Sequence, residues 1–139
     1  MRISIYPRKV CEEHIRGCDL AGIEILVTST YRDVESQAAL YEIGRTKELH
    51  RKPVTNARAG QSWHNFRCAW DVVPIIGGKA AWDSDLWTEI IKIGKAAGAE
   101  AGGEWKTFPD RPHFQVKPDK TFTLVQAMDR FRENGTIFI

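Results

Sequence analysis

The sequence lacks the features of a disulfide-bonded, membrane-spanning or nucleic-acid-binding protein. Its 139 residues include three cysteines, an odd number with no C-x-x-C pair, which fits a reducing compartment better than a disulfide framework. No long hydrophobic run is present, so we expect neither a signal peptide nor stable membrane insertion. The net charge of +2 is too small to favour nucleic acid as a partner.

The length and the pattern of the chain predict one domain over residues 1–139, and we expect a monomer. Hydrophobic residues at 42% and charged residues at 27% are ordinary for a globular protein. Helical periodicity and capping residues predict four helices, over 8–18, 33–44 (capped by Asp33), 84–97 (capped by Asp83 or Ser84) and 123–135 (with a Thr123–Gln126 capping box and Gly135 at its end). Gly77 and Gly78 predict a tight turn.

Runs of β-branched and apolar residues predict a buried strand over 23–31 and further strands over 68–76, 100–105 and 113–116. Residues 45–60 have no periodicity and are expected to form a long exposed loop. The helices and strands do not alternate strictly. The fold class expected is therefore α+β, with a mainly antiparallel sheet flanked by helices.

Two histidines and an aspartate stand out as candidate metal ligands. His64 and Asp71 lie in the aromatic segment 62–71, and His113 lies far downstream. Three nitrogen and oxygen ligands leave a tetrahedral zinc ion one open position, as in catalytic rather than structural sites. Asp110, three residues before His113, is the additional carboxylate that a hydrolytic site needs as a general base.

The spacing of these ligands constrains the local backbone. Seven residues span about 23 Å in a strand and about 10.5 Å in a helix, so neither conformation would let His64 and Asp71 bind one ion. The chain must therefore turn near residues 65–67, and His113 must come from a neighbouring strand. The segment 111–112 must also turn if Asp110 is to face the same site, and a proline at 112 favours that bend.

These motifs resemble a known family of zinc peptidases. Residues 62–71 (S-x-H-x5-A-x-D) and 102–114 (GGEW-x2-F-x-D-x-PHF) are similar to the D-alanyl-D-alanine carboxypeptidases and L-alanyl-D-glutamate peptidases, especially the compact bacteriophage endolysins. Residues 28–32, followed by Gln37 and residues 40–41, match the first motif of that family. The resemblance extends from about residue 27 to 115, and it implies a hedgehog/D-Ala-D-Ala-peptidase-like fold.

The resemblance also implies roles for individual residues. One zinc ion would be held by His64, Asp71 and His113, and Asp110 would be the base that activates the attacking water. Glu104 is a rival for the base, but in the family the acid three residues before the last ligand carries the catalysis. The expected site therefore uses Asp110.

Arg32 and Ser62 are the expected substrate-binding residues. The resemblance implies that Arg32 faces the substrate, where it polarises the scissile carbonyl or holds a carboxylate, and a planar guanidinium suits either task. Ser62 would line the same cleft. The chain departs from the family at Arg67, where glycine is usual. If that position needs a positive φ, arginine would be strained by about 1 kcal/mol or more.

Other residues have both functional and ordinary interpretations. Cys68 is expected to be buried structure, and most of the five tryptophans are expected in the core, except Trp63 and Trp105 beside the cleft. The cations of the loop at 45–60 are either a solvated loop or a surface attracted to an anionic cell wall. These cations are Arg45, Lys47, Arg51, Lys52 and Arg58.

The function that the sequence predicts is a zinc-dependent peptidoglycan hydrolase that cuts the stem peptide at the L-alanyl-D-glutamate bond. It would be made in the cytoplasm, carry no separate cell-wall-binding domain, and reach the periplasm or cell wall through a phage pore during host lysis. Two alternatives remain open: a D-alanyl-D-alanine carboxypeptidase or dipeptidase on the same scaffold, and a non-catalytic zinc-stabilised binding module.

Overall fold

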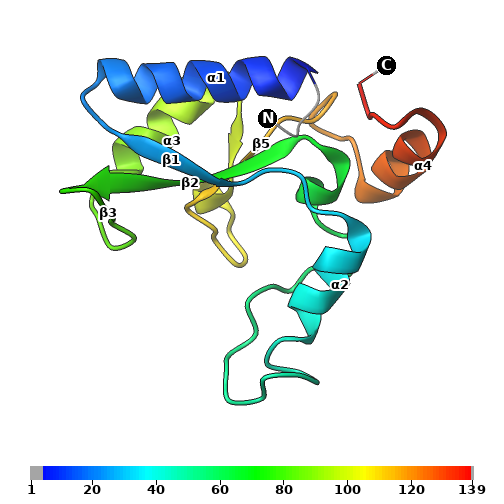
Figure 1. Ribbon diagram of the computed structural model, residues 1–139. Helices are drawn as coiled ribbons and strands as arrows, with labels where there is room; N and C mark the ends of the chain where they lie inside the picture. Colours follow the sequence, from blue (N-terminus) through cyan, green and yellow to red (C-terminus); the bar gives the residue numbers. More distant parts are fainter. Residues whose placement is uncertain (1–4, 139) are drawn as a thin grey trace.

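An antiparallel sheet organises the chain, and the computed structural model describes residues 5–138 (Figure 1). The strand order is β1-β2-β5-β4, and β3 pairs with the far end of β2. The strands are β1 (Ile25–Ser29), β2 (Ala69–Ile76), β3 (Lys79–Ala80), β4 (Glu100–Ala101) and β5 (His113–Gln115). Gly77 and Gly78 both have positive φ and form the tight β2–β3 turn, as the sequence predicts.

Two helices cover one face of this sheet, α1 (Ile5–Leu20) and α3 (Trp87–Ala96). Side chains alternate between faces along a strand, so Trp70 and Phe114, which are register partners on β2 and β5, point to the same side. Both are fully buried, and the ring of His14 from α1 packs against each of them. Gly94 lets α3 approach closely, because a Cβ there would lie 2.7 Å from the Phe114 ring.

A smaller apolar cluster lies beside the sheet, between the 3₁₀ turn η1 (Trp63–Phe66) and helix α4 (Leu124–Asn134). The predicted capping box of α4 is present: Thr123 accepts from the Gln126 amide, and Gln126 accepts from the Thr123 amide. This box satisfies two amide donors at the start of the helix. The cluster holds η1 against α4, and η1 carries His64.

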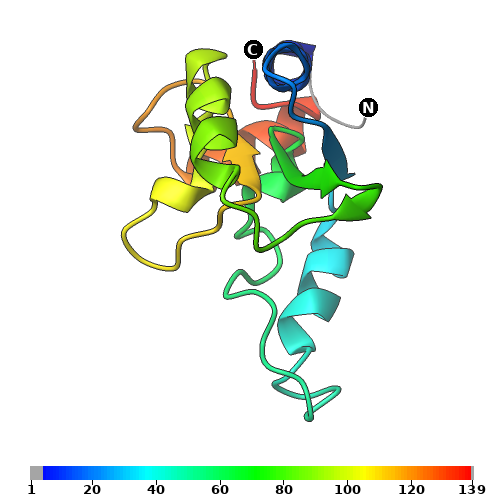
Figure 2. The ribbon, with the colours of Figure 1, turned by 90° about the vertical axis from the view of Figure 1, so that its left-hand side faces the viewer.

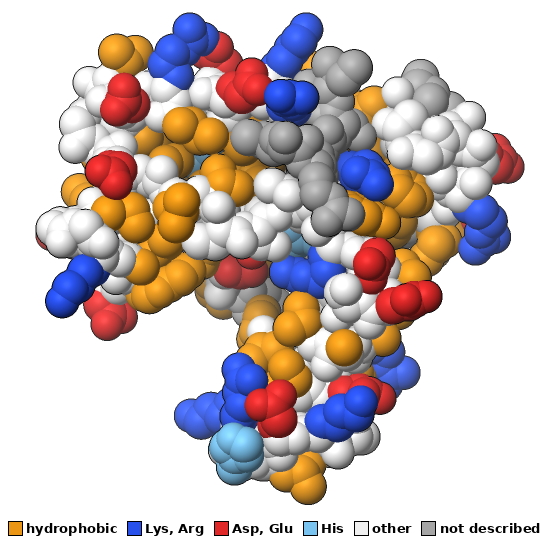
Figure 3. Space-filling view, in the orientation of Figure 1, with side chains coloured by type: hydrophobic (Ala, Val, Ile, Leu, Met, Phe, Trp, Pro, Cys, Tyr) orange, Lys and Arg blue, Asp and Glu red, His pale blue; other side chains and the backbone are white. Residues whose placement is uncertain are grey.

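Helix α2 (Val34–Glu42) and the loop after it extend away from the sheet as an arm (Figures 1 and 2). Asp33 caps the helix by accepting a hydrogen bond from the Ser36 amide, and Gly44 has φ of 80° just after the helix end. The predicted helix and exposed loop are therefore confirmed. Lys and Arg side chains gather on the arm (Figure 3).

Three predicted elements differ from the structure. Residues 25–29 form an edge strand rather than a buried one, and Leu26 is 54% exposed. Helix α3 begins at Trp87 without a side-chain cap, because Ser84 Oγ instead accepts from the Leu86 amide in the preceding turn. In the segment 100–105 only two residues form a strand, and a 3₁₀ turn, η2 (Gly102–Glu104), follows them.

The α+β class with a mainly antiparallel sheet is confirmed, and the helices flank the sheet as expected. Within residues 5–138, no helix is both long and apolar enough to cross a membrane.

Candidate metal centre

The sheet register places Asp71 and His113 side by side. They are direct partners in the antiparallel pairing of β2 with β5, and directly opposed residues of such a pair project to the same face. This face lies opposite the one that α1 and α3 cover. The nearest atoms of the two side chains, Asp71 Oδ1 and His113 Nδ1, are 3.4 Å apart.

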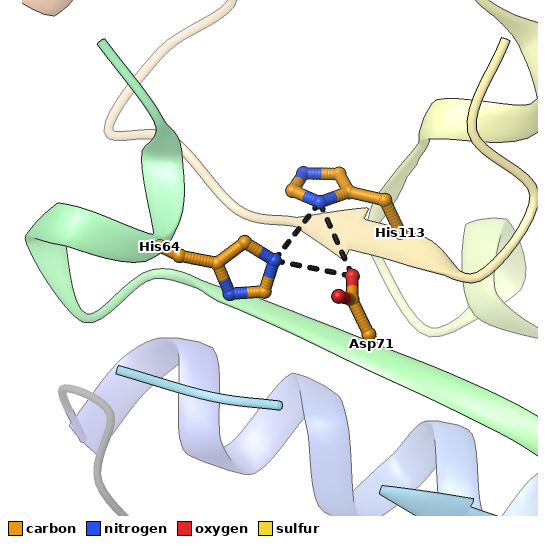
Figure 4. A group of neighbouring side chains, drawn as sticks. All are labelled: His64, Asp71 and His113. Atoms are coloured by element: carbon orange, nitrogen blue, oxygen red, sulfur yellow. Dashed lines mark hydrogen bonds and ion pairs between the residues drawn. The ribbon is translucent and has the colours of Figure 1, made fainter. Parts of the chain in front are cut away.

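His64 reaches the same point from the turn that precedes β2. Ser62 caps η1 by accepting from the His64 amide, and Asn65 completes the cap by accepting from the Ser62 amide. Arg67 then adopts φ 59° and ψ 32°, a left-handed conformation that directs the chain into β2. The predicted turn at residues 65–67 is thus present. His64 Nε2 lies 3.1 Å from Asp71 Oδ1 (Figure 4).

Hydrogen bonds on the far sides of the two imidazoles determine which nitrogens face the centre. Nδ1 of His64 lies 2.7 Å from the carbonyl oxygen of Thr30, so it carries the proton and donates it there. Nε2 of His113 lies 2.7 Å from Gln115 Oε1 and donates to it. In neutral imidazole the other nitrogen is then an acceptor. The inner nitrogens of His64 and His113 therefore both present lone pairs to Asp71.

The three inward atoms fit a tetrahedral cation. Asp71 Oδ1, His64 Nε2 and His113 Nδ1 are separated by 3.1, 3.2 and 3.4 Å. Ligands about 2.0–2.1 Å from a tetrahedral zinc ion stand about 3.3–3.4 Å from one another. Three acceptors at this distance repel each other unless a positive charge lies among them. The donor set of two imidazoles and one carboxylate is one that zinc accepts.

The charge state of Asp71 suits a ligand. Burial by itself would raise the pKa of this carboxyl, but hydrogen bonds and positive charge from His113 and His64, in the doubly protonated form of their rings, outweigh burial and hold the pKa well below its ordinary value. Asp71 is therefore a carboxylate at neutral pH. Both histidines are almost fully buried, so the ligand atoms lie at the bottom of a surface depression.

That depression is a cleft of about 640 Å³, and every candidate site residue lines it. These residues are Arg32, Ser62, His64, Asp71, Asp110 and His113. The indole rings of Trp63 and Trp105 also border it, as the sequence predicts. A substrate held in this cleft would meet the three potential ligands, one further carboxyl group and one guanidinium.

Asp110 reaches the cleft because the chain turns tightly after it. The His113 amide donates to the Asp110 carbonyl at 3.1 Å, which closes a turn with Arg111 and Pro112 at its centre. The Asp110 amide donates to the Gly102 carbonyl. Burial raises the pKa of Asp110, although the nearby His113 acts in the opposite direction. A raised pKa brings a carboxylate closer to the basicity that a general base needs.

Glu104, the rival base, lies elsewhere. Its carboxylate pairs with Lys95 at 3.0 Å on the surface, and both side chains are about half exposed. Glu104 lines a second depression rather than the cleft that contains the three ligands. The geometry therefore favours Asp110 as the base.

Arg32 is held in position by two polar side chains. Its guanidinium donates to Gln37 Oε1 at 2.9 Å and to Ser29 Oγ at 3.3 Å. Gln37 is fully buried and donates in turn to the carbonyl of Ala57. The register of β1 against β2 shifts between Val27 and Ser29, just before Arg32, and such irregularities are common next to functional sites.

Sequence reasoning missed the residues that support this site. Gln37 was part of the first motif, but no pattern of residues indicated that it would contact Arg32. Gln115 follows His113 by two positions, and strand alternation alone could have placed both side chains on one face. The Thr30 carbonyl, which orients His64, could not be predicted because every residue type has the same backbone carbonyl.

Known proteins match the same segments of the chain. Residues 55–116 match the model of the D-alanyl-D-alanine carboxypeptidase family. The peptidoglycan L-alanyl-D-glutamate endopeptidase CwlK of Bacillus subtilis (strain 168) is 36% identical over 108 residues, which are 70% of this chain and 64% of CwlK. The L-alanyl-D-glutamate peptidase of Listeria phage A118 is 32% identical over 97 residues, 68% of this chain and 31% of that protein.

The chain thus spans less than two thirds of the length of these curated relatives. Among solved structures, the vancomycin-resistance D,D-pentapeptidase VanY in complex with Zn(II) has the same fold, with a TM-score of 0.63 at 14% identity over 98% of this chain and 81% of VanY. The matched segment contains all three potential ligands and Asp110. In the segment that carries the candidate ligands, the chain is therefore similar to the D-alanyl-D-alanine carboxypeptidase family, and it shares the fold of VanY.

Proposed function

We propose that this chain is a zinc-dependent peptidoglycan peptidase that hydrolyses the stem peptide at the L-alanyl-D-glutamate bond. The observation that carries the proposal is the convergence of His64, Asp71 and His113 at the base of a cleft that Arg32 and Asp110 also line. CwlK and the phage peptidase, named for that bond, support the choice of substrate. The zinc bound by VanY, together with the donor set here, supports the choice of metal.

His64, Asp71 and His113 would hold the zinc ion. When bound, zinc is a Lewis acid that polarises a carbonyl group and lowers the pKa of water. Two neutral imidazoles and one carboxylate leave this centre with a net charge of plus one, which preserves that acidity.

The remaining steps belong to the side chains around the cleft. Arg32, fixed by Gln37 and Ser29, presents a rigid cation that can bind a substrate carboxylate or the developing oxyanion. Asp110 accepts the proton of the attacking water and then delivers it to the leaving amine. Ser62 and the two tryptophans at the rim would contact the peptide.

The biological setting follows from the same proposal. A peptidase for the stem peptide acts on the cell wall, and the phage relative supports a role in host lysis. We propose that the chain acts as a monomeric catalytic domain.

Replacement of Asp110 by asparagine tests the mechanism. The amide keeps the shape of the side chain but cannot accept the proton, so we expect kcat on purified peptidoglycan to fall by a factor of about 10² to 10⁴ while zinc binding persists. Glu104→Gln is the matched control and is expected to retain wild-type activity. The mechanism is wrong if Glu104→Gln loses activity and Asp110→Asn does not.

Mass spectrometry of the digested muropeptides tests the bond. Stem peptides freed at L-alanine support the endopeptidase, whereas loss of terminal D-alanine would identify the carboxypeptidase alternative. Bound zinc without turnover on either bond would identify a non-catalytic module. Chelation should abolish activity, and added zinc should restore it.

A further inference from the structure

Gln115 is a buried polar side chain that the reaction does not use. It is 3% exposed and lies on β5 two residues after His113, on the same face of the strand. Its Oε1 lies 2.7 Å from Nε2 of His113, the nitrogen that faces away from the metal centre. Gln115 is therefore not a potential ligand itself. It contacts the side of the His113 ring that points away from the metal centre.

Glu100 determines how the Gln115 amide is oriented. It is the register partner of Gln115 in the β4–β5 pairing, and its Oε2 lies 2.9 Å from Gln115 Nε2. A carboxylate can only accept hydrogen bonds, so the NH₂ group of Gln115 must point toward Glu100. The carbonyl oxygen of the amide is then the only group left to face His113.

The consequence is a fixed tautomer at His113. An amide oxygen can only accept, so the proton of the imidazole must lie on Nε2 and the lone pair on Nδ1. That lone pair faces Asp71 Oδ1 and His64 Nε2. If the amide were reversed, its NH₂ group would favour the other tautomer, and a proton would project into the metal centre.

We propose that Gln115 and Glu100 form a positioning pair that sets the tautomer and the orientation of His113 for metal binding. The inference rests on the proposed zinc site but not on the proposed substrate. His64 is served by the backbone carbonyl of Thr30 instead. A substitution cannot remove that backbone carbonyl, whereas the Gln115 and Glu100 side chains can be replaced.

The first test is the affinity for zinc, measured by competition with a chromophoric chelator. Gln115→Leu removes the acceptor, and we expect affinity to fall by about 10- to 100-fold, as is usual for partners of this kind. Glu100→Met leaves the amide free to rotate and should cost less than Gln115→Leu. The exchange variant Gln115→Glu with Glu100→Gln keeps an acceptor facing His113, so it should bind zinc at least as tightly as the wild type.

Lys117→Met is the matched control. Lys117 Nζ pairs with the other oxygen of Glu100 at 3.5 Å, so this change breaks an ion pair at the same carboxylate but leaves the amide contact in place. We expect wild-type zinc affinity. A loss of zinc affinity as large as that of Gln115→Leu would overturn the proposal. It would show that any disturbance of β4 and β5 weakens zinc binding, whether or not the amide contact is kept.

The second readout is the tautomer itself, observed by long-range proton–nitrogen NMR correlations of the histidine rings in the metal-free protein. The wild type and the exchange variant should show His113 protonated on Nε2, and Gln115→Leu and Glu100→Met should show a mixture of tautomers. Unchanged tautomer and unchanged zinc affinity in both of these variants would refute the proposal. A wild type that binds zinc but cleaves no wall substrate would refute the proposed function alone.

Discussion

At the scale of single residues, Arg67 shows how this chain forms a turn for which the family usually has glycine. The residue has φ of 59° and ψ of 32°, so the left-handed conformation is kept despite the side chain. That conformation costs a non-glycine residue roughly 1–2 kcal/mol. The guanidinium lies 4.0 Å from the centre of the Tyr31 ring, and such a contact returns about 0.5–1 kcal/mol at an exposed position.

These two terms predict different effects for two substitutions. Arg67→Ala keeps the strain and loses the contact with Tyr31, so we expect it to lower the free energy of unfolding by about 0.5–1 kcal/mol. Arg67→Gly loses the same contact but relieves the strain, and its greater freedom in the unfolded chain opposes that gain. We therefore expect Arg67→Gly to be near neutral in urea denaturation.

Zinc affinity should not change in either variant, because Arg67 contacts none of the three ligands. If Arg67→Gly were the less stable of the two, the left-handed strain would not be the controlling term.

At the scale of elements, the sequence correctly predicted the helix caps and turns, which depend on the residue types at a few neighbouring positions. The Asp33 and Thr123 caps, the glycine turn at 77–78 and the left-handed Gly135 all appear where residue type alone places them. The turn between His64 and Asp71 was predicted from the distance that seven residues span in a strand or a helix. These features depend on neighbours within a few residues.

The errors arose where distant contacts decide the outcome. The strand at 25–29 is apolar enough to be buried, but its place at the sheet edge leaves Leu26 exposed. Glycines at 102 and 103 allow a tight turn against the chain at 110–113, where a Cβ on Gly102 would lie 2.6 Å from the Asp110 carbonyl. Neither fact can be read from the residues of one segment.

His14 connects three elements, and its ionisation should affect their packing. It donates from Nε2 to the Ile90 carbonyl of α3 and accepts at Nδ1 from the Trp70 indole of β2. Only the neutral ring can do both. Burial lowers the pKa of His14 below its ordinary value of 6.5, although the Ile90 contact acts in the opposite direction.

In the unfolded chain His14 is therefore protonated near pH 6.5, whereas in the folded chain it is protonated only at a lower pH. This contribution to stability is complete above pH 6.5 and is lost as the pH falls below it. We expect the free energy of unfolding, measured by urea denaturation in chelator between pH 7.5 and 5, to fall more steeply for the wild type than for His14→Leu.

The leucine variant should be less stable throughout that range, because it leaves the buried indole N–H of Trp70 unpaired, at a cost of about 1–3 kcal/mol. Chelator removes metal from both proteins, so metal binding contributes to neither curve. Parallel curves would show that His14 does not titrate differently on folding.

At the scale of the whole molecule, the metal centre lies where separately stabilised parts meet. Asp71 and His113 come from the sheet that packs on α1 and α3, whereas His64 comes from η1, which packs against α4 in the smaller cluster. An ion bound by all three side chains would therefore connect the two apolar clusters. Metal binding should stabilise the entire fold and not only the cleft.

The size of this stabilisation can be calculated from mass action. Free zinc at 100 times its dissociation constant should add about 2.7 kcal/mol, which for a chain of this length corresponds to a rise in Tm of roughly 5–10 °C. Asp71→Asn removes the charged ligand and should abolish most of the rise, whereas the exposed Asp129→Asn, a matched change on α4, should keep it. Calorimetry with and without chelator measures both. A rise of equal size in Asp71→Asn would mean that zinc binds elsewhere, and the three side chains would then have another role.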